Sequence, residues 1–256
     1  LRERMKHLLA ALPETEANKE RLAVGQLIAE QAFTQLNRFC ALRMCEERDL
    51  ILESVRAGYD SVGFQSYDAI AQQTGMPKYN RYKWYLHSIF DELSIELPAV
   101  FDRFSPYGLV FPDENTLLKL LDLINDTQLS EWYDEQNGIT VNFWMEDETL
   151  GWMFQDYNSL EERRKMREES NKPRNSREMA VRNQFFTPEY IVRFLTDNSL
   201  GRIWYEMTKG QSRIGEEKCH YMVRRPDETI EERAIKEPTE ILSLDPTCGS
   251  MHFGLY

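Results

Sequence analysis

The sequence predicts a mainly α N-terminal domain followed by the start of an α/β Rossmann-like domain. Apolar residues recur at helical spacing through most of the first 160 residues, with almost no strand signal before residue 218. A highly charged segment follows, and a short apolar run near residue 241 then leads into a turn of small residues. We therefore expect a helical domain over 1–160, a charged linker over 161–182, and the beginning of a second domain over 183–256.

The composition is that of a folded protein, with 41% hydrophobic and 12% aromatic residues. No apolar stretch approaches the ~20 residues of a membrane helix, and no signal-peptide core follows the charged start. We expect a soluble, cytoplasmic protein that begins before Leu1, because an initiator Met is missing. The cysteines form no CxxC pair, which favours free thiols over a disulfide or a metal site; they are Cys40, Cys45, Cys219 and Cys248.

Four segments of the first domain have a predicted structure. Asn18–Glu47 is expected to be one long helix, because apolar residues recur mostly every three or four positions without a proline. Tyr67–Leu93 predicts further helix, broken at Gly75-Met76-Pro77. Ala99–Pro112 is rich in aromatic residues and predicts an ordered loop packed on helices. Asp113–Asn125 predicts a helix with its aspartate as the N-cap.

Charge is unevenly distributed along the chain. The net charge of −12 argues against a nucleic-acid-binding surface over the whole protein. Residues 111–160 hold eleven acidic residues against one lysine, whereas residues 161–182 hold eight basic residues against five acidic ones. A solvated linker is one interpretation of this basic segment, and contact with DNA phosphates is the other. The candidate DNA-binding residues are Arg163, Arg164, Lys165, Arg167, Lys172, Arg174 and Arg177.

The strongest local motif lies near the C-terminal end of the chain. Ile241–Leu244 is an apolar run of strand length, followed by Asp245-Pro246-Thr247-Cys248-Gly249-Ser250. In Rossmann-like sheets a buried strand that ends in an acidic residue and a tight turn receives a cofactor. The carboxylate accepts hydrogen bonds from an amino group and repels a pyrophosphate, which favours a cationic or zwitterionic ligand over a dinucleotide. The alternative is an ordinary strand-to-helix turn.

A second motif, Phe185-Phe186-Thr187-Pro188, predicts the start of a helix. Thr187 suits the N-cap, Pro188 the first helical position, and Phe186 can pack against Ile191. In a functional interpretation, the exposed amides of the first turn and the Thr187 hydroxyl hold a carboxylate. The alternative is a well-capped helix without a further role.

Together and in this order, the two motifs resemble those of adenine-specific, amino-methylating DNA methyltransferases. Ala32–Arg43, Leu150–Gln155 and Asn198–Trp204 are similar to the PglX (BrxX) methyltransferases of BREX phage-defence systems, so the resemblance covers nearly the whole chain. It implies S-adenosylmethionine as cofactor, duplex DNA as substrate and other defence-system proteins as partners. Two alternatives remain: the methyltransferase or specificity part of a type I or type IIG restriction enzyme, and a non-catalytic interaction module.

The resemblance also implies which residues line the cofactor site, with Thr187 near the methionine carboxylate. They are Phe185, Phe186, Thr187, Pro188, Asp245, Pro246, Thr247, Cys248, Gly249 and Phe253. Two features depart from the family pattern. Met251 stands where the commonest family loop has glycine, and the catalytic Asn-Pro-Pro-aromatic motif does not occur in these 256 residues. We therefore assign no catalytic residue and expect this chain alone to be inactive.

Overall fold

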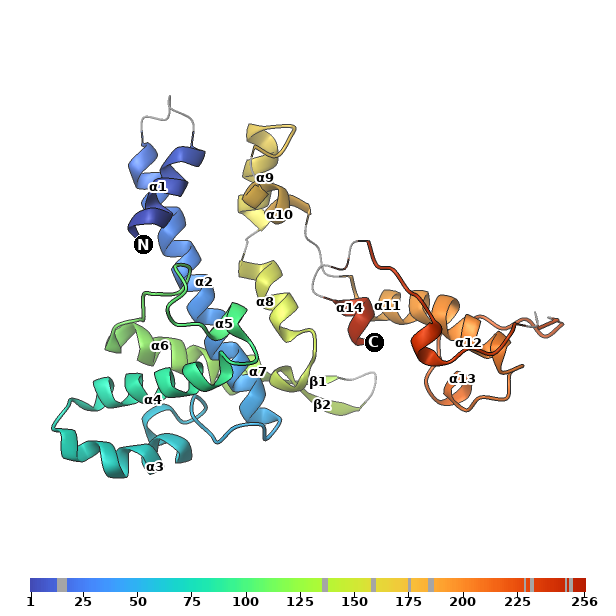
Figure 1. Ribbon diagram of the computed structural model, residues 1–256, viewed down its shortest axis with the longest axis horizontal. Helices are drawn as coiled ribbons and strands as arrows, with labels where there is room; N and C mark the ends of the chain where they lie inside the picture. Colours follow the sequence, from blue (N-terminus) through green and yellow to red (C-terminus); the bar gives the residue numbers. More distant parts are fainter. Residues whose placement is uncertain are drawn as a thin grey trace. The chain divides into compact units, whose positions relative to one another are not determined.

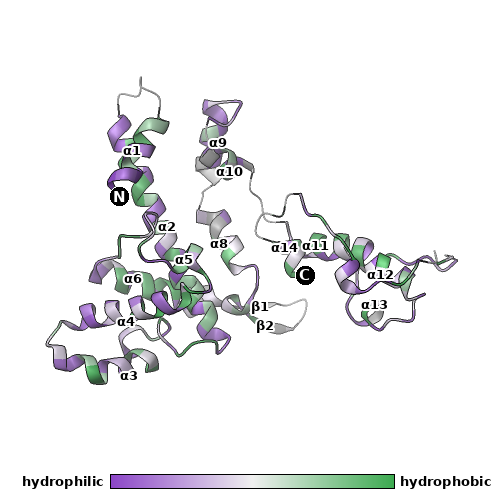
Figure 2. Ribbon diagram, viewed as in Figure 1, coloured by the Kyte–Doolittle hydropathy of each residue, from purple (hydrophilic) through white to green (hydrophobic). Residues whose placement is uncertain are grey.

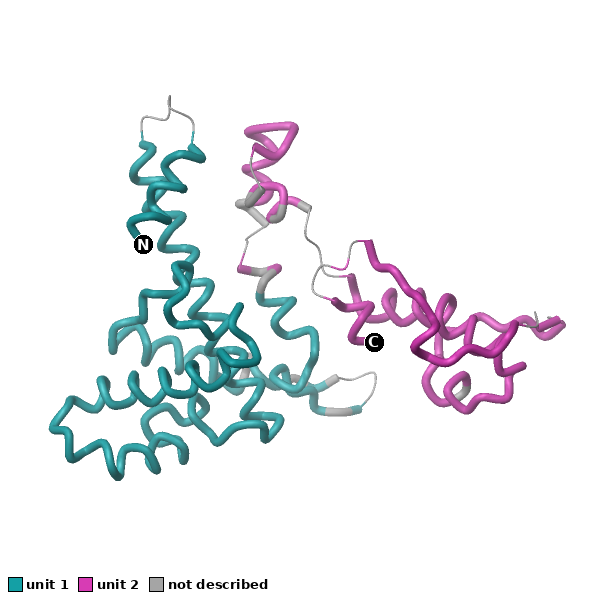
Figure 3. The backbone as a smooth tube through the Cα atoms, viewed as in Figure 1, with its two compact units in different colours: residues 1–153 teal, residues 154–256 magenta. Residues whose placement is uncertain are grey.

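The protein is mainly helical and divides into two compact units (Figure 1, Figure 3). The first unit is Leu1–Met153 and the second is Phe154–Tyr256. No described helix is long and apolar enough to cross a membrane. The computed structural model describes residues 1–12, 18–134, 138–157, 160–174, 176–183, 187–227, 229–230, 233–246, 248 and 251–256.

The first unit consists of helices joined by short connections and one small antiparallel hairpin. In the hairpin, Glu131 of the first strand lies opposite Asn142 of the second. Helix α8 spans the division between the two units. The elements are α1 (Arg2–Ala11), α2 (Lys19–Glu47), η1 (Gly58–Asp60), α3 (Val62–Ala71), η2 (Gln72–Thr74), α4 (Lys78–Leu93), α5 (Pro98–Phe101), α6 (Glu114–Ile124), α7 (Thr127–Ser130), β1 (Glu131–Asp134), β2 (Ile139–Asn142), η3 (Phe143–Met145) and α8 (Thr149–Tyr157).

The core of this unit gathers apolar side chains from α2, α4 and α6. Phe39 of α2 and Phe90 of α4 are fully buried and meet edge to face, with ring centroids 6.4 Å apart. The helices predicted at 18–47, 67–93 and 113–125 are confirmed, including the break after Thr74. Asp113 caps α6 as predicted, since its carboxylate accepts the amide of Thr116 at 3.0 Å. These predictions succeeded because spacing and capping are local signals.

One buried arginine holds the predicted loop on the core. The Arg38 side chain, 1% exposed, donates to the carbonyl oxygens of Val100, Gly108 and Asp102 at 2.8, 2.8 and 2.7 Å. Gln35 beside it donates to the carbonyl of Gly108 at 3.0 Å. The expectation of an ordered loop packed on helices is confirmed for residues 102–112, whereas residues 98–101 form the short helix α5. The packing of both on the core depends on main-chain acceptors.

The second unit carries both sequence motifs. Helices α9 and α10 contact each other and occupy most of the segment predicted as a linker, each extending one residue beyond it. The role of this segment between two domains remains a prediction. The π-helical segment η4 continues directly from α11. The elements are α9 (Leu160–Glu169), α10 (Ser176–Asn183), α11 (Glu189–Thr196), η4 (Asp197–Gly201), α12 (Arg202–Met207), α13 (Ile214–Glu217), η5 (Pro238–Glu240) and α14 (His252–Leu255).

The strand predicted at Ile241–Leu244 does not form. Residues 241–245 are irregular, and Leu242 and Leu244 are 94% and 87% exposed. An apolar run becomes a buried strand only when neighbouring strands satisfy its backbone hydrogen bonds. Among the described residues of the second unit no strand offers that pairing, so the Rossmann-like sheet is not seen here.

Candidate functional site

The two sequence motifs meet in the second unit. Nδ1 of His252, the first residue of α14, lies 3.3 Å from the carbonyl oxygen of Thr187. Helices α11 and α14 are in contact as well (Figure 1). Thr187, which lies just before α11, and helix α14 therefore lie side by side, although 65 residues separate Thr187 from His252.

Helix α11 begins one residue later than predicted. Pro188, not Thr187, is the N-cap, and no side chain caps the helix. The amides of Ile191 and Val192 donate to the Pro188 carbonyl at 2.9 and 3.2 Å. The prediction of Thr187 as N-cap is therefore wrong by one position, because proline in extended backbone precedes the first turn. The amides that start α11 still have the orientation in which a helix accepts an anion.

Four of the six cofactor-site residues predicted near the C-terminal end are described. Asp245 is half-buried, Pro246 and Cys248 are exposed, and Phe253 is half-buried in α14. The turn closes where the amide of Met251 donates to the Cys248 carbonyl at 2.7 Å. The other predicted cofactor residues lie outside the described part of the chain: Phe185, Phe186, Thr247 and Gly249.

Met251 adopts a backbone conformation that favours glycine. Its φ and ψ angles are 68° and 23°, in the left-handed region. A side chain in this region costs about 1–2 kcal/mol relative to the right-handed conformation. The departure from the family pattern noted in the sequence therefore falls where the backbone itself favours the family's glycine.

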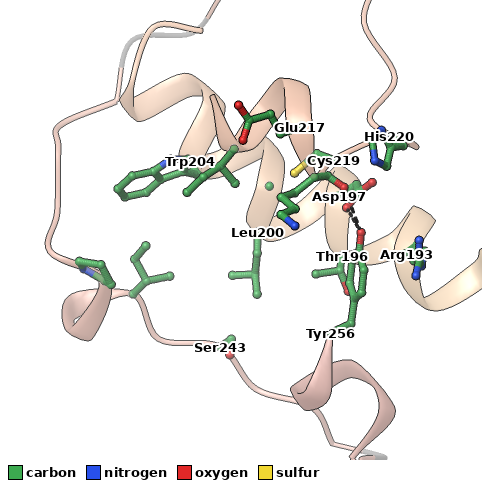
Figure 4. A pocket seen from close by; sticks show the side chains of 15 residues that line it. Arg193, Thr196, Asp197, Leu200, Trp204, Glu217, Cys219, His220, Ser243 and Tyr256 are labelled. Atoms are coloured by element: carbon green, nitrogen blue, oxygen red, sulfur yellow. Dashed lines mark hydrogen bonds between the residues drawn. The ribbon is translucent and has the colours of Figure 1, made fainter. Parts of the chain in front are cut away.

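A pocket of about 720 Å³ opens beside η4. Figure 4 shows Trp204 at one end of it, and Asp197 with Tyr256 at the other. Apolar side chains from α12, α13 and the segment before Asp245 supply much of its wall. Its lining comprises Arg193, Thr196, Asp197, Leu200, Gly201, Trp204, Ile214, Glu217, Lys218, Cys219, His220, Pro238, Ile241, Ser243 and Tyr256.

A buried carboxylate organises one end of this pocket. Asp197, 1% exposed, accepts the amide of Tyr221 at 2.9 Å and the hydroxyl of Tyr256 at 3.1 Å. Burial and the neighbouring carboxylate raise the pKa of the Cys219 thiol, which also donates to Asp197. The same two causes raise the pKa of Tyr256 to about 12. Both donors are therefore protonated at neutral pH, and Cys219 is not an activated nucleophile.

Sequence reasoning did not single out Asp197 or Tyr256. Asp197 stands in a polar stretch at the end of a helical pattern, where an exposed acid is the ordinary expectation. Its burial follows from contacts with residues 24 and 59 positions away. No local pattern contains that information.

The predicted DNA-binding cluster consists largely of arginines that are already engaged within the protein. Arg163 is buried and donates to the Gln155 carbonyl, whereas Arg164 and Arg174 pair with glutamates. Arg167 donates to the carbonyl of Arg182, and the side chain of Arg177 lies outside the described part. The two lysines of the cluster, Lys165 and Lys172, are exposed. Contact of this cluster with phosphates remains a prediction.

Two curated relatives match the sequence, whereas no family model does. The chain is 24% identical over 271 residues to the adenine-specific methyltransferase PglX of Lacticaseibacillus casei (strain Zhang), which covers 91% of this chain and 22% of that protein. It is 33% identical over 117 residues to the adenine-specific methyltransferase BrxX of Escherichia coli O9:H4 (strain HS), which covers 43% of this chain and 9% of that protein.

The chain thus spans about a fifth or less of the length of these relatives. The first match nevertheless extends over nine-tenths of the chain, so it includes residues of both units. The resemblance that the motifs predicted is confirmed: the chain is a homologue of the adenine-specific methyltransferases PglX and BrxX.

Proposed function

We propose that the chain is part of a site-specific DNA adenine-N6 methyltransferase that uses S-adenosylmethionine and acts in BREX-type phage defence in the cytoplasm. The contact between Thr187 and His252 carries the proposal, because it joins the two motifs that the family uses to bind the cofactor. In this proposal residues 1–160 are a helical domain, 161–182 a linker, and 183–256 the beginning of a Rossmann-like methyltransferase domain. Duplex DNA and other defence-system proteins are its partners.

The residues present fit a zwitterionic cofactor. The amides that start α11 and the half-buried Thr187 suit a carboxylate, whereas the Asp245 carboxylate suits an amino group. Phe253, on α14, is positioned by the same turn as Met251. When bound, S-adenosylmethionine supplies an electrophilic methyl group on its sulfonium. The protein's own contribution would be to orient the cofactor and the target amine.

The basic cluster of residues 163–177 is the proposed phosphate contact of this part of the protein. Its exposed lysines, Lys165 and Lys172, are the side chains best suited to that contact, because most of the arginines described there already bind glutamates or carbonyls. The catalytic Asn-Pro-Pro-aromatic motif is absent from the sequence. We therefore expect this chain alone to transfer no methyl group.

The test is methyl transfer to duplex DNA by the whole protein that carries this chain. Digested DNA is analysed for N6-methyladenine by mass spectrometry, with S-adenosylmethionine as the methyl source. We expect the wild type to produce N6-methyladenine. Asp245→Ala should lower the methylation rate at least tenfold, because it removes one charge-assisted hydrogen bond of about 1.5–3 kcal/mol. The control Asp227→Ala, at an exposed acid of the same unit, should keep normal activity.

Methylation at another base, or full activity of Asp245→Ala, would overturn the proposed function or the proposed site, respectively. The 256-residue chain serves as a further control. Methyl transfer by this chain alone would show that catalytic residues lie within it.

A further inference from the structure

Helix α14 is too short to be stable through its own hydrogen bonds. It has four residues, whereas isolated helices need about 12–15 residues to form in water. Hydrophobic residues lie on both α14 and the neighbouring helix α11 (Figure 2), but apolar contact is non-directional and does not fix the direction of a helix. The position of α14 therefore depends on specific polar contacts with its surroundings.

Two polar contacts hold α14 against α11, one at each end. Nδ1 of His252, its first residue, lies 3.3 Å from the carbonyl oxygen of Thr187, which precedes α11. Tyr256, which follows its last residue, donates its hydroxyl at 3.1 Å to Asp197, where α11 ends. One contact would leave the helix free to rotate about it, whereas two contacts define its direction. The bond between Tyr256 and Asp197 is the second of these two attachments.

The Asp197 carboxylate is itself held in place. It is 1% exposed and accepts the amide of Tyr221 at 2.9 Å through Oδ2, which leaves Oδ1 for the hydroxyl of Tyr256 (Figure 4). Cys219 donates its thiol to the same carboxylate. Asp197 also stands where α11 passes into η4, and π-helical turns are rare and frequently occur at functional sites. Burying a carboxylate costs free energy that an apolar side chain would not, so stability alone does not account for an aspartate here.

The position of α14 also sets that of the turn before it. The amide of Met251, the N-cap of α14, donates to the carbonyl of Cys248 at 2.7 Å. The amides of Gly254 and Leu255 in turn donate to the Met251 carbonyl at 2.9 Å. The turn and the helix therefore form one hydrogen-bonded piece, and the segment that carries Asp245 leads into it.

We propose that Asp197 is a positioning residue of the cofactor site, which holds α14 and the turn before it beside the start of α11 through the hydroxyl of Tyr256. The inference rests on the proposed function for its choice of ligand, S-adenosylmethionine. In that function the start of α11 binds the cofactor's carboxylate and Asp245 its amino group, so both bind well only when the two segments keep their distance. Asp197 and Tyr256 act on affinity through the fraction of molecules in which α14 is in place, without touching the cofactor.

The test measures binding of S-adenosylmethionine to the whole protein that carries this chain, by isothermal titration calorimetry without DNA. Tyr256→Phe removes the hydroxyl that joins α14 to Asp197 and leaves the bond from the Tyr221 amide in place. The control Tyr205→Phe removes the hydroxyl of another tyrosine of the same unit, on α12. We expect Tyr256→Phe to raise the Kd about two- to tenfold, the equivalent of one hydrogen bond, and Tyr205→Phe to leave it unchanged. An unchanged Kd in a folded Tyr256→Phe variant overturns the inference.

Steady-state methylation separates placement of α14 from stability of the protein. A variant that is only destabilised has fewer active molecules, so its apparent kcat falls while its KM for S-adenosylmethionine stays the same. Loss of placement instead raises this KM and leaves kcat at saturating cofactor unchanged. We expect the second pattern for Tyr256→Phe. A fall in kcat at constant KM would show a merely structural role.

A conservative substitution at Asp197 provides a rescue. The amide introduced by Asp197→Asn can accept from the Tyr221 amide and donate to the Tyr256 oxygen, whose hydroxyl still reaches the Lys218 carbonyl at 3.3 Å. We therefore expect Asp197→Asn to keep the Kd of the wild type and Asp197→Ala to raise it, with circular dichroism verifying that each variant is folded. Equal loss of affinity in both variants would contradict positioning by these hydrogen bonds.

The outcome is separable from that of the proposed function. A wild type that binds S-adenosylmethionine but makes no N6-methyladenine rejects the proposed function, whereas weaker binding by Tyr256→Phe in that protein still supports the role of Asp197. A wild type that makes N6-methyladenine, with a Tyr256→Phe variant that binds the cofactor as tightly, rejects the role of Asp197 alone.

Discussion

The hydroxyl of Tyr256 donates to Oδ1 of Asp197 at 3.1 Å, across 59 residues of sequence. The guanidinium of Arg193 lies 5.4 Å from the centre of the same tyrosine ring. One aromatic side chain therefore joins α14 to the end of α11, at the margin of the pocket. Because the Tyr256 hydroxyl must be protonated to donate to Asp197, this contact within the second unit depends on pH.

We expect Tyr256→Phe to destabilise the second unit by about 0.5–1.5 kcal/mol at pH 8, the usual net contribution of one hydrogen bond. Burial and Asp197 raise the pKa of Tyr256 from 10 to about 12. Because the folded pKa is the higher one, the contribution is fully present below pH 10 and is lost as the pH rises toward 12. Urea denaturation at pH 8, 10 and 12 should show the wild type and the variant converging. A constant difference between them would contradict the role of the phenol.

His87 should make the first unit sensitive to mild acid. Burial, with Arg103 and Lys83 nearby, lowers the pKa of His87 from 6.5 to about 4. Because the folded pKa is the lower one, its contribution is present above pH 6.5 and is lost as the pH falls through 4. The ring meets Phe111 edge to face at 5.0 Å, so His87→Phe should pack there without titrating. Thermal unfolding at pH 7, 5.5 and 4 should show a smaller drop in Tm toward low pH for the variant than for the wild type. Parallel plots of Tm against pH for the two proteins would contradict this role of His87.

Met251→Gly should stabilise the turn before α14. The left-handed backbone at this position costs a side chain about 1–2 kcal/mol, and glycine recovers part of it after its larger loss of chain entropy. Hydrogen exchange of residues 251–256 should slow, and the whole protein should bind S-adenosylmethionine more tightly. The matched control is Met179→Gly within α10, where glycine should destabilise by about 1 kcal/mol. Faster exchange at 251–256 in Met251→Gly would contradict this account.

Arg38→Lys should be costly although the charge is conserved. The guanidinium reaches three carbonyl oxygens at once, whereas one ammonium on a single stem cannot span all three. At least one buried carbonyl then loses its partner, and we expect a loss of about 2–4 kcal/mol in the free energy of unfolding. Urea denaturation measures it, with Arg21→Lys on the exposed face of the same helix as the control. Equal free energies of unfolding for the two variants would show that the three hydrogen bonds of Arg38 contribute little to stability.

Features that depend on residues close together in the sequence were predicted, whereas features that depend on distant residues were not. The helix over 18–47 and the Asp113 cap depend on neighbours within a few residues, and both were predicted. The β1–β2 hairpin was missed, although the dipeptide Asn137-Gly138 between two strand-length runs is a known hairpin signal. The strand predicted at Ile241–Leu244 was wrong, because an apolar run forms a strand only where neighbouring strands pair with it, and the run itself does not contain that information.

In the candidate site, too, contiguous residues could be predicted from the sequence and contacts between distant residues could not. The motif residues around Thr187 and Asp245 could be predicted from sequence because each motif is contiguous, and their place in a cofactor site stays a prediction. Asp197 and Tyr256 were not, because their pairing exists only after α11 and α14 come together. The helix start at Glu189 differed by one residue from the prediction, since proline accommodates either the cap or the first helical position.

The three hydrogen bonds from Arg38 to main-chain carbonyls affect how related sequences can diverge. Its three acceptors are main-chain carbonyls, which every amino acid provides. Residues of the loop over 98–112 can therefore be exchanged without any compensating change at position 38. Methods that infer contacts from correlated substitutions depend on paired changes, so this contact would leave no trace in them. Relatives should instead keep an arginine at this place above a loop of variable sequence and nearly constant length.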